Sequence, residues 1–170
     1  MNMPVKAVLF DRDGTLNVDT GYLFRREEFR WTPEAPLALA WLKRRGCDIY
    51  VITNQSGIAR GYFTVEDMEK LHNFMNDDLS HKGVEIKKFY YCPHLEGGRV
   101  AEFARACDCR KPKPGLVLEC LRENHLQPEE CILIGDKERD LQCAAAAGVR
   151  GHLYQGGSLL NFVRQVMEGR

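Results

Sequence analysis

The stretch VLFDRDGTLN, residues 8–17, places two carboxylates directly after a short apolar run. Residues 6–10 (KAVLF) have the length and composition of a buried β-strand. Asp11 and Asp13 follow one residue apart, with Gly14 and Thr15 behind them. Such a pair is either an ordinary polar turn or a site for chemistry. The remainder of the chain has to distinguish these two interpretations.

The sequence alternates short apolar runs with longer helical patterns. Further strands are expected at 47–53, 86–92, 130–136 and 150–155, and helices at 32–46, 64–83, 114–125, 138–148 and 158–169. Thr32 is expected to cap the first helix, and Thr64 and Asp67 to form a capping box on the second. Strands that alternate with helices predict an α/β fold, a Rossmann-like parallel sheet with helices on both faces.

Length and composition limit the function classes. The 170 residues are expected to form a single domain, 1–170, because no repeat, linker or segment long enough for a separate cap domain appears. The formal net charge is zero, which gives no electrostatic reason to expect nucleic acid or a membrane as partner. The N-terminal apolar run is too short for a signal peptide or a membrane span, so we expect a cytoplasmic protein, and nothing demands more than a monomer.

Polar residues follow three of the expected strands. Asp11 and Asp13 end the first, the run 53–56 (TNQS) ends the second, and Asp136 with Asp140 follows the strand at 130–136. Because parallel strands present their carboxyl ends at one edge of a sheet, these side chains should meet there, together with Arg110 and Lys111. Each residue alone is typical of a turn or a helix cap. The arrival of several such residues at one edge of the sheet favours a functional site.

Clustered carboxylates repel one another and therefore favour binding of a hard dication such as Mg²⁺. An EF-hand is excluded because its glycine belongs later in the loop, helices should flank it and the closing Glu is absent. A metal and cationic side chains together suit a small phosphorylated substrate. One carboxylate could then attack phosphorus while the other transfers a proton.

Cys92, His94, Cys107 and Cys109 crowd one polar loop, residues 92–109. Three thiolates and one imidazole form a recognised closed zinc site, although each pair is spaced one residue apart, unlike common zinc fingers. The alternative is a loop with scattered free cysteines. A structural Zn²⁺ would hold a loop of this length, and it would leave no position open for water or substrate. Disulfides are not expected, because seven cysteines are an odd number and the expected compartment is reducing.

Four segments, DRDGTLN, VITNQSG, CRKPKPG and IGDKERD, together resemble the four motifs of haloacid dehalogenase-like phosphatases, in order and over nearly the whole chain. The resemblance implies that Asp11 is the nucleophile and Asp13 the general acid/base. It further implies that Thr53 and Lys111 hold the transferred phosphoryl group. Mg²⁺ would be bound by Asp11, by the backbone carbonyl of Asp13 and by Asp136, with Asp140 behind them.

A zinc loop at this place is similar to one branch of that family, which contains heptose bisphosphate phosphatases and histidinol-phosphate phosphatases. The segments NVDTGYLF (17–24) and NQSGIARGYFT (54–64) and the long spacer before Cys107 resemble the heptose members, and histidinol phosphate is the alternative substrate. The resemblance implies a set of substrate-binding residues: Asp19, Thr20, Gly21, Tyr22, Asn54, Gln55, Ser56, Arg110 and Lys137. It also implies a place in heptose precursor synthesis for bacterial surface glycans.

Overall fold

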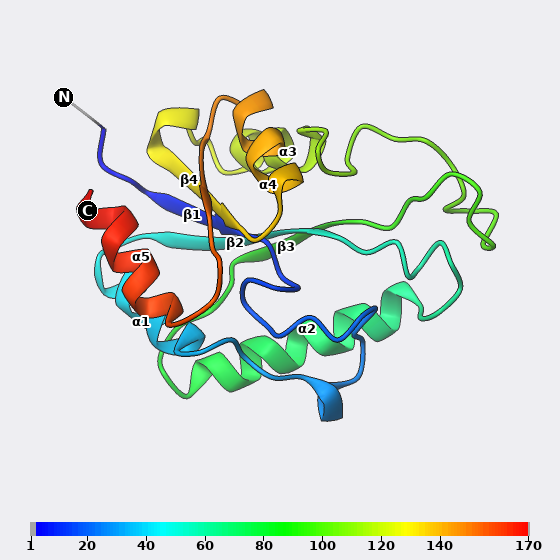
Figure 1. Ribbon diagram of the computed structural model, residues 1–170, viewed down its shortest axis with the longest axis horizontal. Helices are drawn as coiled ribbons and strands as arrows, with labels where there is room; N and C mark the ends of the chain where they lie inside the picture. The colour runs from blue at the N-terminus through cyan, green and yellow to red at the C-terminus, as the bar shows by residue number, and fades with distance from the viewer. Residues whose placement is uncertain (1–2, 170) are drawn as a thin grey trace.

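The computed structural model describes residues 3–169 and contains a five-stranded parallel sheet. The strands are β1 (Ala7–Phe10), β2 (Asp48–Asn54), β3 (Lys88–Cys92), β4 (Cys131–Gly135) and β5 (Arg150–Leu153). Their order is β3-β2-β1-β4-β5, so β1 is central, with β2 and β4 on either side of it (Figure 1). All four strand pairings are parallel, as the alternation of strands and helices predicts.

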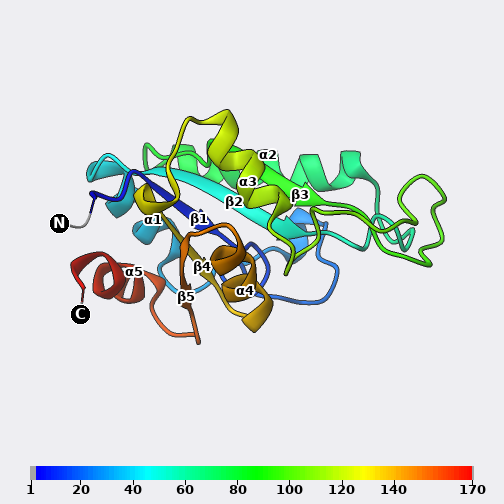
Figure 2. The same cartoon turned by 90° about the horizontal axis from the view of Figure 1, so that it is seen from above.

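Helices cover both faces of the sheet (Figures 1 and 2). They are α1 (Ala35–Arg44), α2 (Val65–Ser80), α3 (Gly115–Glu123), α4 (Glu138–Ala146) and α5 (Leu159–Glu168), with short 3-10 helices η1 (Arg26–Glu28) and η2 (Pro128–Glu130). Residues of α1, α2 and α5 pack with Val8 and Phe10 in one apolar core. Residues of α3 and α4 pack with Ala7 and Leu9 in the other. Successive residues of β1 thus pack alternately into the two cores, which explains why residues 7–10 are all apolar.

The carboxyl ends of β1, β2 and β4 lie at one edge of the sheet, and the inserted segments leave from this edge. Residues 11–34 contain only η1 as a helix, and residues 93–114 form a long loop beyond β3 (right side of Figure 1). Within residues 3–169, no second sheet or helical bundle covers the edge, in agreement with the prediction of no separate cap domain. The space above the edge is therefore shaped mainly by loops.

One of the two predicted helix caps is wrong. Thr64 and Asp67 form the expected capping box at the start of α2. Thr32 does not cap α1, which begins at Ala35 after Glu34 in a left-handed conformation with φ 60°. The hydroxyl of Thr32 instead donates to the carbonyl of Thr15 at 2.7 Å. It therefore ties the loop after β1 to the segment before α1.

Cysteines outside the polar loop belong to the apolar cores. Cys47, Cys120, Cys131 and Cys143 are buried and free. They behave as small hydrophobic residues. Among the helices described, none combines the length and the apolar character that crossing a membrane requires.

Candidate active site

Lys111 is the centre of the polar cluster at the sheet edge. Its side chain is buried, and its ammonium group donates to Asp11 at 2.7 Å, to Asp140 at 2.7 Å and to the carbonyl of Ile52 at 2.8 Å. Three acceptors satisfy all three of its protons. Residues from β1, β2, α4 and the long loop thus meet at one nitrogen atom, as the strand-end argument predicts.

Asn54 fixes the backbone of Lys111. Its side-chain oxygen accepts from the Lys111 amide at 3.0 Å, and its side-chain nitrogen donates to the Lys111 carbonyl at 3.2 Å. This pair of bonds resembles one step of a β-ladder made by a side chain. It anchors the far end of the loop to the end of β2.

Gly14 allows Asp136 to approach the loop after β1. Gly14 has φ +89°, and a Cβ atom there would lie 2.2 Å from Oδ2 of Asp136. A side chain is therefore excluded by both backbone conformation and space. The small residue that follows the carboxylate pair is needed to bring Asp136 beside it, and Thr15 donates to Asp136 at 3.4 Å.

The electrostatics of the cluster favour a further cation. Asp11, Asp136 and Asp140 each offer an oxygen within 4.8 Å of the others, whereas Lys111 is the one cation buried among them in the part of the chain described. Burial raises the pKa of Asp11 well above its usual range, although Lys111 opposes this rise. Burial opposes the charge of Lys111, but the two carboxylates outweigh it and raise the pKa of the ammonium. Oxygen donors with excess negative charge fit a hard dication, which would lower the pKa of Asp11 and favour its carboxylate form.

Asp13 is held by three donors. Arg12 and Asn17 donate to its Oδ1 at 3.0 and 3.1 Å, and Gln55 donates to its Oδ2 at 3.0 Å. Gln55 also donates to the hydroxyl of Thr53 at 2.8 Å, so the ends of β1 and β2 share one network. The side chain of Asp13 keeps 22% of its surface exposed, whereas that of Asp11 keeps 9%. Asp13 can thus meet both a substrate oxygen and water.

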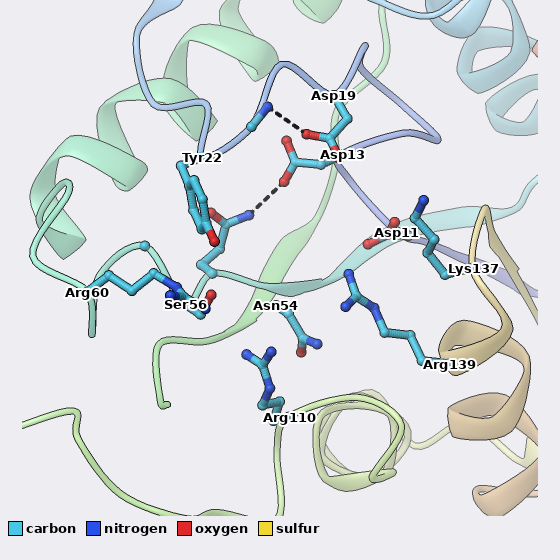
Figure 3. A pocket seen from close by; sticks show the side chains of 13 residues that line it. Asp11, Asp13, Asp19, Tyr22, Asn54, Ser56, Arg60, Arg110, Lys137 and Arg139 are labelled. Carbon is cyan, nitrogen blue, oxygen red and sulfur yellow. Dashed lines mark hydrogen bonds between the residues drawn. The ribbon is translucent and has the colours of Figure 1, made fainter. Parts of the chain in front are cut away.

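A pocket of about 430 Å³ opens above Asp11 and Asp13 (Figure 3). Eight of the nine predicted substrate-binding residues line it: Asp19, Gly21, Tyr22, Asn54, Gln55, Ser56, Arg110 and Lys137. Thr20 is exposed on the same loop but is not among the lining residues. Thr53 and Lys111 lie buried beneath the pocket.

Sequence reasoning missed two cationic residues of this pocket. Arg60 lies across from the carboxylates beside Tyr22, and Arg139 belongs to the first turn of α4 (Figure 3). Both occur in segments that were identified, 54–64 and the strand end before Asp140. Helical position could have identified Arg139, because the first turn after a strand faces the same edge. Among residues 3–169, buried nitrogens of Arg60 and Arg110 have no hydrogen-bond partner, which suits an anionic ligand.

The four predicted zinc ligands come together in the long loop. Sγ of Cys92 lies 2.8 Å from that of Cys109 and 3.5 Å from that of Cys107, and Nδ1 of His94 lies 3.4 Å from Sγ of Cys109. Tetrahedral zinc with sulfur at about 2.3 Å requires ligand separations of roughly 3.5–3.8 Å. The hydrogen bond from Cys109 to Cys92 lowers the pKa of Cys92 and raises that of Cys109, so the pair favours ionisation of Cys92 over Cys109. The ligand types fit a closed zinc site, and the sulfur distances from Cys107 match it, whereas Cys92 and Cys109, 2.8 Å apart, would have to separate by about 1 Å to hold the ion.

Comparison with known sequences gives relatives over most of the chain. A family model described as "HAD-hyrolase-like" matches residues 108–160. A D-glycero-beta-D-manno-heptose-1,7-bisphosphate 7-phosphatase of Escherichia coli O6:H1 is 43% identical over 149 residues, 88% of this chain and 78% of the relative. The phosphatase of the same name from Pasteurella multocida is 40% identical over 145 residues, 85% of this chain and 78% of the relative. These names favour the heptose alternative over histidinol phosphate.

Solved structures agree with this relationship. A putative HAD-like phosphatase from Mesorhizobium loti superposes with a TM-score of 0.85 at 30% identity, covering 98% of this chain and 87% of the other. The D,D-heptose 1,7-bisphosphate phosphatase of B. bronchiseptica, complexed with magnesium and phosphate, gives 0.83 at 27% identity, covering 98% and 100%. Together with the sequence identities, they show that the chain belongs to the haloacid dehalogenase-like hydrolases, in the family of D-glycero-D-manno-heptose-1,7-bisphosphate 7-phosphatases.

Proposed function

We propose that this chain is a Mg²⁺-dependent phosphatase that hydrolyses D-glycero-D-manno-heptose 1,7-bisphosphate at C7. The observation that carries the proposal is the juxtaposition of the Asp11–Lys111 pair with a pocket lined by four cations: Arg60, Arg110, Lys137 and Arg139. A substrate with a second phosphate needs cationic groups away from the reacting centre. Arg60 and Arg110 are such groups, whereas Lys137 lies 3.7 Å from Asp136 (Figure 3). The names and identities of the relatives support the choice of sugar.

In the proposed reaction, a carboxylate oxygen of Asp11 forms a bond to phosphorus while the bond from phosphorus to the C7 oxygen breaks. The proton of Asp13 passes to the departing oxygen. Asp13 then takes a proton from water, whose oxygen attacks phosphorus and releases inorganic phosphate and the Asp11 carboxylate. Lys111, with Thr53, would hold the transferred phosphoryl group once the Asp11 oxygen that now accepts from its ammonium has bonded to phosphorus, which frees that proton for a phosphoryl oxygen.

Asp11, Asp136 and the backbone carbonyl of Asp13 would hold Mg²⁺. The ion would supply charge neutralisation at the phosphoryl oxygens and keep Asp11 ionised. The donor set supports this assignment, since two carboxylates and a carbonyl are hard oxygen ligands.

Arg110 is the proposed ligand of the second phosphate, at C1, and Lys137, which lies 3.7 Å from Asp136, is proposed to contact the substrate nearer the reacting centre. Both line the pocket, and a buried nitrogen of Arg110 has no hydrogen-bond partner among residues 3–169 and can donate to an anion. A guanidinium group can bind phosphate through two parallel hydrogen bonds. We further propose that residues 1–170 form one phosphatase domain, in which Zn²⁺ on the four ligands of loop 92–109 has a structural role. The reaction would serve heptose precursor synthesis for bacterial surface glycans.

Phosphate release from a panel of esters tests the proposal. The panel contains both anomers of the heptose 1,7-bisphosphate, histidinol phosphate and fructose 1,6-bisphosphate, each assayed with and without Mg²⁺. We expect the highest kcat/KM with a heptose bisphosphate and loss of activity with a chelator. The names of the relatives specify the β anomer, which should be preferred. A higher kcat/KM with histidinol phosphate, or activity independent of Mg²⁺, would refute the proposal.

A further inference from the structure

Arg12, between the two catalytic-site carboxylates in sequence, is the largest of the fully buried side chains. Its exposure is 0%, and its partner in the one ion pair that it forms among residues 3–169 is Asp13, at 3.0 Å. Taking a guanidinium group out of water is unfavourable unless it is well paired. The burial of the Arg12 guanidinium group beside Asp13 is therefore unfavourable by itself, which points to a role for this cation at Asp13.

Arg12 contacts three different parts of the molecule. One of its terminal nitrogens, Nη2, donates both to Asp13 and to the carbonyl of Leu23 at 2.9 Å, just beyond the loop that carries Asp19 and Tyr22. The other, Nη1, lies 3.1 Å from Nε2 of His72 on α2. The end of β1, the loop that lines the pocket and α2 are thus joined through one side chain.

His72 is built to accept this hydrogen bond. Its ring stacks on Phe89 of β3, with centroids 4.0 Å apart and planes 9° from parallel. A guanidinium group can only donate, so Nε2 of His72 must accept and the ring proton must be on Nδ1. Burial, and then the charge of Arg12, lower the pKa of His72 well below its usual value, which keeps the ring neutral and able to accept. The ring is fixed in position on one side by Phe89.

We propose that Arg12, braced by His72, is a positioning residue that aims the Asp13 carboxyl group at the oxygen leaving phosphorus. This rests on the proposed function, because Asp13 is its acid/base. Arg12 does not touch the substrate. It fixes Oδ1 of Asp13 from behind, together with Asn17, so that the carboxyl group keeps one orientation when a substrate enters. A misplacement of about 1 Å in such a group can cost on the order of 100-fold in rate.

Leaving-group dependence distinguishes positioning of an acid from general support of the fold. Two small substrates of similar shape are compared, p-nitrophenyl phosphate, whose leaving group needs no proton, and benzyl phosphate, whose leaving group does. Because kcat/KM reports only the steps up to departure of the leaving group, the ratio of the two kcat/KM values measures proton donation. In Arg12→Met we expect this ratio, nitrophenyl over benzyl, to rise about 30-fold, within the range of general-acid effects.

A matched pair at position 72 gives an independent test that leaves Arg12 in place. His72→Phe removes the acceptor and should raise the ratio about fivefold, whereas His72→Gln keeps an acceptor and should leave it within twofold of the parent. This pair decides the matter if Arg12→Met fails to fold. Equal losses on both substrates in Arg12→Met, or equal ratios in the two His72 variants, would overturn the proposal. A parent chain that hydrolyses neither ester nor heptose bisphosphate would instead refute the proposed function.

Discussion

The two clusters of candidate metal ligands are built in different ways. Asp11 and Asp136 directly follow β1 and β4, two paired strands in the middle of the sheet, so the register of the sheet sets their separation. Cys107 and Cys109 lie in a segment without helix or strand, and only Cys92 of that cluster belongs to a strand. The carboxylate cluster is a consequence of the sheet, whereas the Cys/His cluster joins the two ends of a loop that is otherwise held by scattered hydrogen bonds, such as Val100 to Ala59. Damage to the first should impair chemistry, and damage to the second should impair stability.

Asp11→Asn should have the largest effect on activity and little effect on folding. The variant lacks a nucleophile, so kcat should fall by at least about 10³-fold, while Lys111 keeps Asp140 as a partner. Phosphate release and thermal unfolding are measured side by side. Asp77→Asn, at an exposed carboxylate on α2, is the control and should retain full activity. Near-normal turnover in Asp11→Asn would rule out a covalent intermediate on this residue.

Gly14→Ala should distort the carboxylate cluster without removing any of its carboxylates. The new Cβ would lie 2.2 Å from Asp136, so the proposed metal ligand has to move. We expect the Mg²⁺ concentration for half-maximal activity to rise by about tenfold or more, the scale of effect seen when the support of a metal ligand is lost.

Gly46→Ala is the matched control for that experiment. Gly46 has φ +78° and no atom within 4 Å of the added Cβ, so this substitution carries the backbone strain alone. Both variants should lose roughly 1 kcal/mol of unfolding free energy from the left-handed conformation. An equal Mg²⁺ requirement in the two variants would show that Asp136 is not displaced.

Cys107→Ser should act mainly on stability. Loss of one of four zinc ligands should lower the free energy of unfolding by roughly 3 kcal/mol and the melting temperature by about 6–12 °C, and metal analysis should find less than one Zn²⁺ per chain. Cys47→Ser is the control for loss of a buried thiol outside the cluster, because Cys47 packs in an apolar core and donates to the carbonyl of Val5, which a hydroxyl can also do. Equal stability and zinc content in the two variants would contradict a structural zinc site.

His72 should contribute the smallest effect, visible in the pH dependence of stability. Its pKa is lowered in the folded state, so the unfolded chain takes up the proton first as pH falls below about 6.5. The stability of the parent should therefore decline toward acid by up to about 1.4 kcal/mol per pH unit from this residue. His72→Gln should show a shallower decline between pH 7 and 5 in denaturant titrations. Identical slopes would mean that the ring is protonated in the folded protein.

The comparison of the two clusters also explains what the sequence could reveal. Asp11, Asp13 and Asp136 were found because each follows an apolar run, and parallel strands bring such positions to one edge. Cys92 and His94 were found by ligand type and spacing. An Asp after an apolar run and the spacing of Cys and His can both be read from short stretches of sequence. The topology of a parallel sheet then brings the strand ends together, whatever the directions of individual side chains.

The sequence did not reveal residues whose role depends on the orientation of their side chains in the folded protein. Arg12 stands between two aspartates and reads as part of a polar turn, and nothing in its neighbours predicts a buried partner on α2, 60 positions away. Arg60 and Arg139 belong to recognised segments, but their side-chain directions depend on loop conformation. Thr32 is predicted to be a helix cap from its type and its position before Pro33, whereas its hydroxyl donates to the carbonyl of Thr15 in the loop after β1.

The pair of hydrogen bonds between Asn54 and the main chain of Lys111 lies between the two clusters of candidate metal ligands. Cys109 is only two positions before Lys111, so we expect this anchor to limit how far a displacement of the cysteines reaches toward the carboxylates. Arg110 lies on the unprotected side of it. Removal of Zn²⁺ should therefore leave Lys111 in position but weaken the binding of the second phosphate by Arg110. The expected effect is a higher KM with little change in kcat.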